Sequence, residues 1–361
     1  MRPYSVTIEQ IQQGMITVDD VLSPSGQLVV PKETMLNPRL ISRLKLYNVK
    51  RLYVMIPDNV AEGLNKITPL TAVNPIKVSH EFKVFRHSYK EMAKNLEEAF
   101  QGVTVHPDAR HDYSKVVNQV LNLAGTVKNT MHLMDTLQCL REYSDTVYIH
   151  SISVALISYM IAAKKKYSSD DMRLLITASL FHDIGKLHIP VEILNKPSRL
   201  TDAEYELVKK HPQLGYEILK KAHFPSEVLL PALLHHERCD GSGYPFGVTM
   251  ERIPELARII AIADVYDAMT ARRAYRNEIC SFDVIEDFEN SGYQKFDTAL
   301  LIPFLDSIAQ SHINVKVRLS NSLVGTIVMI NQHRLSKPVV NVDGTFLDLS
   351  KEKDISVIGL L

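Results

Sequence analysis

Apolar and polar positions follow different periods along this chain, and the changes of period predict its organisation. Between residues 85 and 311 apolar side chains recur every three or four positions, which is the spacing of a helix with one buried face. Examples are Met92, Leu96 and Phe100, followed by Val116, Val120 and Ala124. This central region is therefore predicted to be a helical bundle.

The first 60 residues carry shorter apolar runs around one helical stretch. The segment 37–49, NPRLISRLKLYNV, has helical spacing, and the strand-like run RLYVMI follows it at 51–56. A small α/β regulatory module is therefore predicted for 1–60. Residues 61–84 contain Pro69 and Pro75 and show no clear period, so they are predicted to form a connecting segment.

The pattern changes again after residue 311. The runs NVKVRLSNSLVGTIVMINQ and KPVVNVDGTFLDLS contain short β-branched stretches broken by Asn and Gly, with a turn signal at Asp343 and Gly344. A small β-rich domain is predicted for 312–361. The fold class is thus mainly α: a helical catalytic domain over 85–311, with a small α/β module before it and a small β domain after it.

Composition and charge exclude several classes of binding partner and site. The chain has 41 basic and 41 acidic side chains among 361 residues, a balance that argues against long nucleic acid as a partner. Neither a signal peptide nor a membrane span is recognisable, so a cytoplasmic protein is expected. The three cysteines, Cys139, Cys239 and Cys280, are widely spaced and favour neither a disulfide framework nor a structural zinc site.

Polar residues stand at the end of one very apolar helix. The run DMRLLITASLF at 171–181 leads directly into His182 and Asp183. Burying a carboxylate and an imidazole costs several kcal/mol unless they are paired or bind a metal, so a function is favoured. By themselves, the two residues fit a hydrogen-bonded pair or a helix cap as well as they fit a metal site.

Other histidines and carboxylates lie in comparable places. His150 lies beside the apolar face of 146–163, and His211 is the last residue of the helix-like run DAEYELVKKH. His235 and His236, with Glu237, end the run EVLLPALLHHE. Asp264 and Asp267, three residues apart, share one side of an apolar helix. Imidazoles mixed with carboxylates favour Fe, Mn, Zn, Ni or Co over Mg or Ca. A carboxylate bridging two such ions would suit hydrolysis of a phosphoester.

Several of these residues lie in a recognisable order of motifs. His182-Asp183-Ile184-Gly185-Lys186 is preceded by His150 and followed by His211, by the run HHERCDGSGYP at 235–245, and by Asp264. This order resembles the HD-GYP domain of the HD superfamily over roughly residues 128–310. The His-Asp pair is a weak signal, whereas the HHExxDGxGYP pattern is highly specific.

The resemblance implies a phosphodiesterase that opens cyclic di-GMP to pGpG and, in some members, on to GMP. It implies one metal at His150, His182, Asp183 and Asp264 and a second at Asp183, His211, His235 and His236, with Asp183 as the bridge and a hydroxide between the metals as nucleophile. Two divalent ions, Fe or Mn, are expected. Members with three metals carry Glu at the position of Thr146, so a third metal is not expected here.

The resemblance also implies residues that bind substrate. Lys186 would point at the scissile phosphate, while Arg273 and Arg276 stand at the family's phosphate-binding positions. Gly243 and Tyr244 belong to a loop next to the substrate, which is also a candidate docking site for a diguanylate cyclase of the GGDEF type. Two residues of the same motif, Glu237 and Asp240, could orient the ligand imidazoles or shape this loop.

The sequence leaves alternatives to cyclic di-GMP hydrolysis open. The fold could serve 3′,3′-cyclic GMP-AMP instead, or it could be a sensor or docking module that binds a cyclic dinucleotide without hydrolysing it. The intact ligand set argues against the sensor. A nuclease or deoxynucleotide triphosphohydrolase fits the GYP motif less well. The oligomeric state is open, with a homodimer as one candidate.

Overall fold

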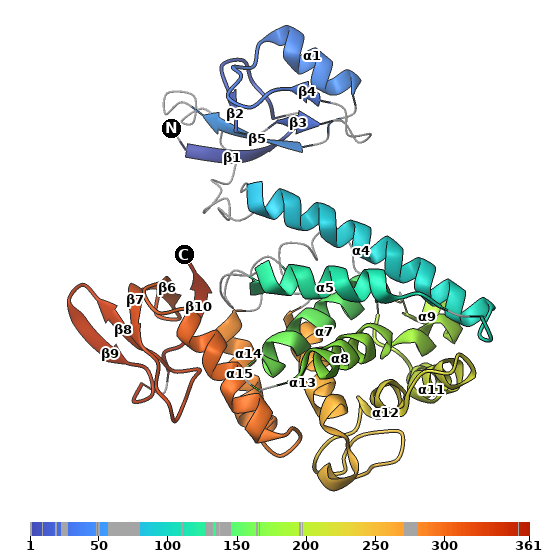
Figure 1. Cartoon of the computed structure of the whole chain (residues 1–361). Helices are drawn as coiled ribbons and strands as arrows, with labels where there is room; N and C mark the ends of the chain where they lie inside the picture. The colour runs from blue at the N-terminus through green and yellow to red at the C-terminus, as the bar shows by residue number, and fades with distance from the viewer. Residues whose placement is uncertain are drawn as a thin grey trace. The chain divides into compact units, whose positions relative to one another are not determined.

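A computed structural model describes residues 2–361 of the chain apart from 9, 19, 23–27, 48, 50, 57–79, 110, 127–132, 135–136, 138–145, 164, 166, 195, 197, 271–279 and 353. The chain separates into two compact units, residues 1–83 and 84–361 (Figure 1). Each unit has its own core and is described by itself.

The N-terminal unit is a small α/β fold, as its sequence predicts. Its strands are β1 (Arg2–Thr7), β2 (Ile16–Thr17), β3 (Val21–Leu22), β4 (Leu28–Val30) and β5 (Arg51–Ile56), and its helix is α1 (Pro38–Leu46). Strands β1, β5 and β2 form an antiparallel sheet in that order, while β3 pairs with β4. The helix begins where Asn37 caps it and buries Leu44 in the core of the unit, so both predicted elements are confirmed.

The second unit is mainly helical, which confirms the predicted fold class. Its helices are α4 (His80–Val105), α5 (Ser114–Thr126), α7 (Val147–Ala162), α8 (Ser169–Phe181), η1 (Ile184–His188), α9 (Val191–Leu194), α10 (Asp202–Val208), α11 (His211–Lys221), α12 (Ser226–Leu234), η2 (Met250–Arg252), α13 (Glu255–Thr270), α14 (Ser281–Ser291) and α15 (Thr298–Ser311). Helix α4 starts at His80, inside the segment 61–84 that was predicted as a connection; most of that segment lies outside the described residues.

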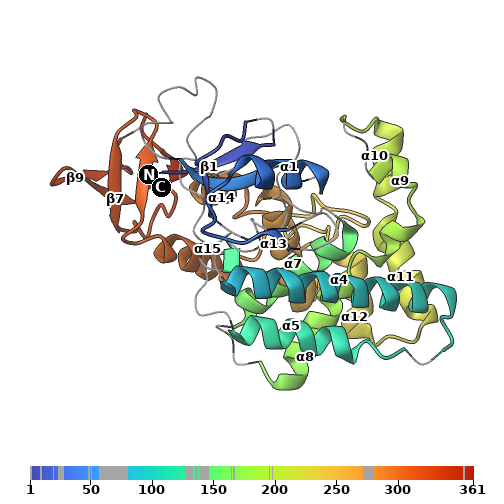
Figure 2. The same cartoon turned by 90° about the horizontal axis from the view of Figure 1, so that it is seen from above.

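Helix α7 lies at the centre of the bundle. It packs against α8, α13, α5 and α15, and it is buried on nearly every side because its sequence is apolar all round (Figure 1, Figure 2). The long helix α4 also reaches it, since the buried Tyr89 hydroxyl donates to the Ile149 carbonyl at 2.9 Å. Helices α4 and α5 are joined by a hydrogen bond from Asn95 to Gln119. The first turn of α7, which carries His150, is therefore held firmly.

The C-terminal residues form the predicted β structure. Strands β6 (Lys316–Leu319), β7 (Val324–Met329), β8 (Val339–Val342), β9 (Thr345–Asp348) and β10 (Val357–Leu360) make an antiparallel sheet in the order β10-β6-β7-β8-β9. Asp343 and Gly344 both have positive φ angles, 48° and 89°, as the tight turn between β8 and β9 requires. The sheet lies in the same compact unit as the helices, so the predicted boundary at 311/312 stays a prediction.

Two further expectations concern the whole chain. Across the described ranges, no helix combines the length and the apolar character that a membrane span needs. Cys239 and Cys280 are free thiols, while Cys139 lies outside the described residues.

Candidate metal centre

The ends of several helices bring the predicted ligands together. His150 lies in the first turn of α7, His182 and Asp183 directly follow α8, and His211 begins α11. His235 and His236 follow α12, and Asp264 lies on the buried face of α13. His182, Asp183 and His235 are fully buried. Polar groups with so little access to water need strong partners.

A glycine makes the approach of His211 to Asp183 possible. A Cβ atom on Gly185 would lie 2.0 Å from the His211 carbonyl oxygen and 2.5 Å from the Gly215 nitrogen, so only glycine fits between η1 and α11. The close packing of these two helices places His211 Nε2 3.2 Å from Asp183 Oδ1. Gly185 of the predicted motif thus allows the close packing that brings His211 to Asp183, although it has no side chain that could bind a metal.

The ligand atoms form two groups that meet at Asp183. Asp183, His211, His235 and His236 form one group, and His150, His182 and Asp264 form the other; within each group the donor atoms lie within 4.8 Å of one another. Asp183 Oδ1 faces the first group, whereas Asp183 Oδ2 lies 3.4 Å from His150 Nε2 and 3.5 Å from His182 Nε2. One carboxylate therefore presents one oxygen to each group, which is the arrangement that a bridging ligand needs.

Backbone carbonyls hold several imidazoles in one orientation. Nδ1 of His182 lies 2.7 Å from the Ser179 carbonyl oxygen, Nδ1 of His211 lies 2.7 Å from that of Val208, and Nδ1 of His235 lies 3.0 Å from that of Ala232. A carbonyl only accepts, so each Nδ1 carries the proton and each Nε2 keeps its lone pair. Lone pairs directed into a buried cluster fit a metal ion. His182 Nε2 supports this, because it is buried and has no hydrogen-bond partner among the described residues.

Burial and local charges favour the metal-binding protonation states of five of the predicted ligands. Burial lowers the pKa of His182, His235 and His236, so these imidazoles are neutral near pH 7. Burial alone would raise the pKa of both carboxyls, those of Asp183 and Asp264. Lys186 and the surrounding histidines hold the pKa of Asp183 well below its ordinary range, and His150, His236 and His182 do the same for Asp264. Neutral imidazoles and ionised carboxylates are the forms that bind divalent metals.

Asp267 joins this site, although it was not predicted as a ligand. Its buried Oδ2 accepts a hydrogen bond from His150 Nδ1 at 2.6 Å, which leaves His150 Nε2 facing Asp264 Oδ1 at 3.1 Å. A carboxylate behind a ligand imidazole orients the ring and makes it a stronger ligand. The signal was present in the sequence, because Asp264 and Asp267 share one face of an apolar helix.

Lys186 lies at the edge of the ligand cluster. Its ammonium donates to Asp183 Oδ2 at 2.5 Å, and its side chain keeps 22% exposure. Its ammonium is therefore anchored at the His/Asp cluster while the side chain stays partly exposed to solvent. Thr146, at the position where a third-metal Glu was considered, caps α7 instead by accepting a hydrogen bond from the Ile149 nitrogen.

The loop after His236 is built directly against the ligands. A Cβ atom on Gly243 would lie 2.4 to 2.5 Å from backbone atoms of His236, Glu237 and Arg238, so glycine is required there. Next in sequence, Tyr244 stacks on the His236 ring, with 4.6 Å between ring centres and 25° between ring planes. The two predicted loop residues thus lie beside a predicted ligand.

The role of Glu237, which the sequence left open, follows from its contacts. Its carboxylate is 1% exposed and accepts hydrogen bonds from the Phe246 nitrogen at 2.7 Å and the Val248 nitrogen at 3.1 Å. Glu237 therefore shapes the loop from inside. Asp240 also shapes it, by accepting from the backbone nitrogen and the hydroxyl of Ser242. The other two predicted substrate residues, Arg273 and Arg276, lie outside the described residues.

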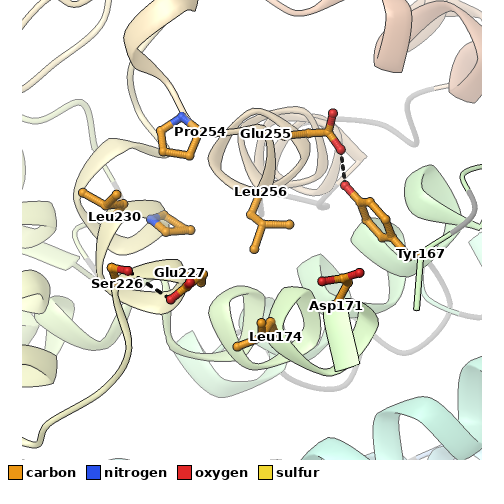
Figure 3. A pocket seen from close by; sticks show the side chains of 10 residues that line it. Tyr167, Asp171, Leu174, Ser226, Glu227, Leu230, Pro254, Glu255 and Leu256 are labelled. Atoms are coloured by element: carbon orange, nitrogen blue, oxygen red, sulfur yellow. Dashed lines mark hydrogen bonds between the residues drawn. The ribbon is translucent and has the colours of Figure 1, made fainter. Parts of the chain in front are cut away.

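A separate cleft lies at the opposite ends of three of these helices. It has a volume of about 410 Å³, and its walls come from the beginnings of α8, α12 and α13 (Figure 3). The carboxylates around it, those of Asp171, Glu227 and Glu255, all accept hydrogen bonds. Such satisfied polar groups cap and link helices, in contrast to the buried cluster.

The fold and the His/Asp cluster together define an HD-domain protein, and comparison with known proteins agrees. Residues 126–300 match the HD domain family model. The chain is 30% identical over 317 residues to a cyclic di-GMP phosphodiesterase of Pseudomonas aeruginosa, covering 84% of this chain and 75% of that protein. It is 39% identical over 142 residues to a 3′3′-cGAMP-specific phosphodiesterase of Vibrio cholerae, covering 39% of this chain and 33% of that protein.

A solved structure supports the fold. A HDG"Y"P protein from Bdellovibrio bacteriovorus superposes with a TM-score of 0.51 at 17% identity, covering 85% of this chain and 99% of that one. The chain belongs to the HD-GYP family of the HD superfamily. The family identity predicted from the motifs is thereby confirmed.

Proposed function

We propose that this protein is a phosphodiesterase that hydrolyses cyclic di-GMP to pGpG, with further hydrolysis to GMP as a second step. The observation that carries this proposal is the position of Asp183, whose two oxygens face two separate groups of ligands. A single-metal site would not need that arrangement. Relatives named as cyclic di-GMP phosphodiesterases, which are 30% identical over 317 residues and 35% identical over 179 residues, support the substrate class.

The ligands would hold two divalent transition metals, Fe or Mn. His150, His182, Asp183 and Asp264 would hold one ion, and Asp183, His211, His235 and His236 the other. Bound there, the ions would acidify an attacking water and neutralise charge on the phosphate. The cap formed by Thr146 supports a count of two over three, because that side chain is already used by the backbone of α7.

The protein's own side chains would handle the phosphate and the leaving group. Lys186, held at the cluster by Asp183, would donate to a phosphate oxygen whose negative charge grows in the transition state. Arg273 and Arg276 would bind phosphate oxygens through paired N–H donors. Gly243 and Tyr244 would form a wall of the substrate site, with Tyr244 fixed against His236.

A second candidate substrate is 3′,3′-cyclic GMP-AMP. It is favoured by the similarity to the Vibrio cholerae enzyme specific for that nucleotide, which reaches 39% identity over 142 residues. Both nucleotides have the same ring of two phosphates and differ in one base. The metal centre would treat them alike, and the choice would fall to residues that contact the bases.

Two further assignments belong to this proposal. The loop that contains Gly243 and Tyr244 is the candidate contact for a diguanylate cyclase of the GGDEF type, and the exposed side chain of Phe246, two residues after Tyr244, supports this assignment. The cytoplasm, where a cyclic dinucleotide messenger would act, is the proposed location, and a homodimer is the proposed assembly.

The proposal is tested by anaerobic purification with Fe or Mn, quantitation of metal per chain, and chromatography of the products from cyclic di-GMP and cyclic GMP-AMP. About two metals per chain and conversion of cyclic di-GMP to pGpG are expected. Faster hydrolysis of cyclic GMP-AMP than of cyclic di-GMP would assign cyclic GMP-AMP as the substrate instead. A metal-loaded protein that binds either nucleotide without hydrolysing it would instead be a sensor.

A further inference from the structure

A short row of side chains leads away from the metal ligands towards the surface. Tyr244 stacks on His236 at one end of the row. The ammonium nitrogen of Lys209 lies 6.0 Å from the centre of the Tyr244 ring and 5.4 Å from the centre of the Tyr205 ring. The order is therefore His236, Tyr244, Lys209 and Tyr205, so that an aromatic ring and a cation alternate beyond the ligand.

Tyr205 is an exposed aromatic side chain at the outer end of this row. It keeps 48% of its accessible surface, while Tyr244 is partly buried. The Tyr205 phenol is near enough to Tyr244 to contribute, after burial, to the raised pKa of the Tyr244 hydroxyl. An open aromatic face next to a cation is the combination on which nucleobases stack in proteins that bind single strands.

The element that carries Tyr205 and Lys209 is held in place. Helix α10, seen at the edge of the bundle in Figure 2, starts with a capping box between Thr201 and Glu204. The Glu204 carboxylate also accepts from Lys196 Nζ at 2.6 Å. Helix α10 is followed within three residues by His211, the first residue of α11. The capping box and Lys196 hold the start of α10, and the short connection to His211 keeps its end close to a predicted metal ligand.

Lys209 remains able to bind an anion. Its ammonium is 2.5 Å from Glu206 Oε1, but the Glu206 side chain is 64% exposed and Lys209 keeps 27% exposure. Exposed pairs of this kind contribute little, and an ammonium has three N–H donors. A phosphate could thus share or replace the contact with Glu206 at small cost.

From this row we infer a substrate subsite, which rests on the function proposed above. A cyclic dinucleotide has two phosphates and two bases, and only one phosphate can occupy the metal centre at a time. Lys209 binds the phosphate that is not being cleaved, and the exposed face of Tyr205 stacks on the base next to it. The two residues are substrate-binding residues that act on the half of the nucleotide away from the metals.

The test compares two substrates that differ in this half. Cyclic di-GMP has it, whereas bis(p-nitrophenyl) phosphate has one phosphate and no nucleobase. In the metal-loaded full chain, Tyr205→Ala and Lys209→Met should each lower the ratio of kcat/KM for cyclic di-GMP to kcat/KM for bis(p-nitrophenyl) phosphate by about tenfold, since loss of one stacking partner has that order of effect. Most of the change should be in KM, with metal content per chain unchanged.

The chain provides a matched control pair. Tyr216 and Lys220 on α11 have the same spacing, with Lys220 Nζ 5.7 Å from the centre of the Tyr216 ring. Tyr216→Ala and Lys220→Met should leave the ratio within about twofold of the original protein, as expected for surface substitutions away from a binding site.

Each outcome decides the inference. Ratios for Tyr205→Ala and Lys209→Met that stay with those of the control pair would overturn the subsite while leaving the proposed phosphodiesterase intact. A parallel loss on both substrates together with metal would show a structural role and would overturn it as well. If the unmodified protein hydrolyses bis(p-nitrophenyl) phosphate but neither binds nor cleaves a cyclic dinucleotide, the proposed function fails, and the subsite with it.

Discussion

The two ends of helices α8, α12 and α13 both carry polar residues, but those at one end line an open cleft and those at the other end are buried. At their beginnings, Asp171, Glu227 and Glu255 surround the open cleft, where nearby hydroxyls, a lysine and one backbone nitrogen donate hydrogen bonds to them. Towards their other ends, the histidines and Asp183 are buried against one another. The buried end is about 16 Å away along α8, counting 1.5 Å for each residue from Asp171 to His182.

The comparison shows which polar residues point to chemistry. Carboxylates at helix beginnings stabilise the helix dipole and the free N–H groups, so their presence there needs no function beyond folding. Imidazoles and carboxylates buried together, with lone pairs directed at one another, are costly unless a cation binds between them. The difference lies in burial and in the partners, since the residue types overlap.

The largest expected effect comes from Asp183. Asp183→Asn keeps the shape but removes the charge that faces both groups of ligands, so turnover should fall by about a thousandfold or more. Metal content should fall below one ion per chain. The matched change at the other end of α8, Asp171→Asn, should keep turnover within about twofold because it affects only a helix start. Equal losses of turnover in the two variants would contradict the conclusion that only the buried end of α8 takes part in catalysis.

A smaller effect is expected where the carboxylate lies behind a ligand. Asp267→Asn removes the acceptor that orients His150, and the affinity for the metal held by His150 should fall by about 10- to 100-fold. Calorimetric titration of the metal-free protein with Mn²⁺ measures this without any assay of activity. Unchanged affinity would mean that helix α7 alone orients the His150 ring.

The buried end should also make the metal-free protein sensitive to mild acid. His182, His235 and His236 have lowered pKa values in the folded state, so below about pH 6.5 the unfolded chain takes up protons that the folded chain does not. The free energy of unfolding should therefore decrease as the pH is lowered below about 6.5, by up to about 1.4 kcal/mol per pH unit for each such histidine. His150 opposes this: burial would lower its pKa, but bonds to Asp183 and Asp264 raise it.

Urea unfolding of the chelator-treated protein at pH 7.5 and pH 5.5 measures this dependence. His235→Asn should reduce the difference in stability between the two pH values, because it removes one of the three predicted ligand histidines whose pKa is lowered. A metal-free protein as stable at pH 5.5 as at pH 7.5 would contradict the assignment of neutral imidazoles.

The smallest effect is expected at the cleft. Glu255 accepts from Lys165 at 2.6 Å, and both side chains are 37% exposed, so solvent screens much of the interaction. Glu255→Gln should cost less than about 1 kcal/mol of stability and should leave metal content and turnover unchanged. Thermal unfolding and metal quantitation on the same sample check both expectations. A loss of metal would show that the two ends of α13 are coupled.

Much of the fold and the order of the motifs could be predicted because they depend on local patterns. Helical spacing located α5, α7 and α8, and the Asp343-Gly344 pair located a tight turn, since each signal lies within a few residues. The HHExxDGxGYP run was specific enough to indicate the family and, through it, the ligand residues. These predictions needed no knowledge of which helices touch.

Other features depended on contacts between distant segments. The sequence left open whether Glu237 orients ligands or shapes the loop, and its contacts with Phe246 and Val248 favour the loop. It placed Asp267 beside Asp264 but not behind His150, 117 residues away in the chain. The row from His236 to Tyr205 had no motif at all. The sequence alone determined the residue types and their local elements, whereas the packing of α7, α10, α11 and α13 decided which atoms face one another, because directional hydrogen bonds and ligand geometry are set only when those helices meet.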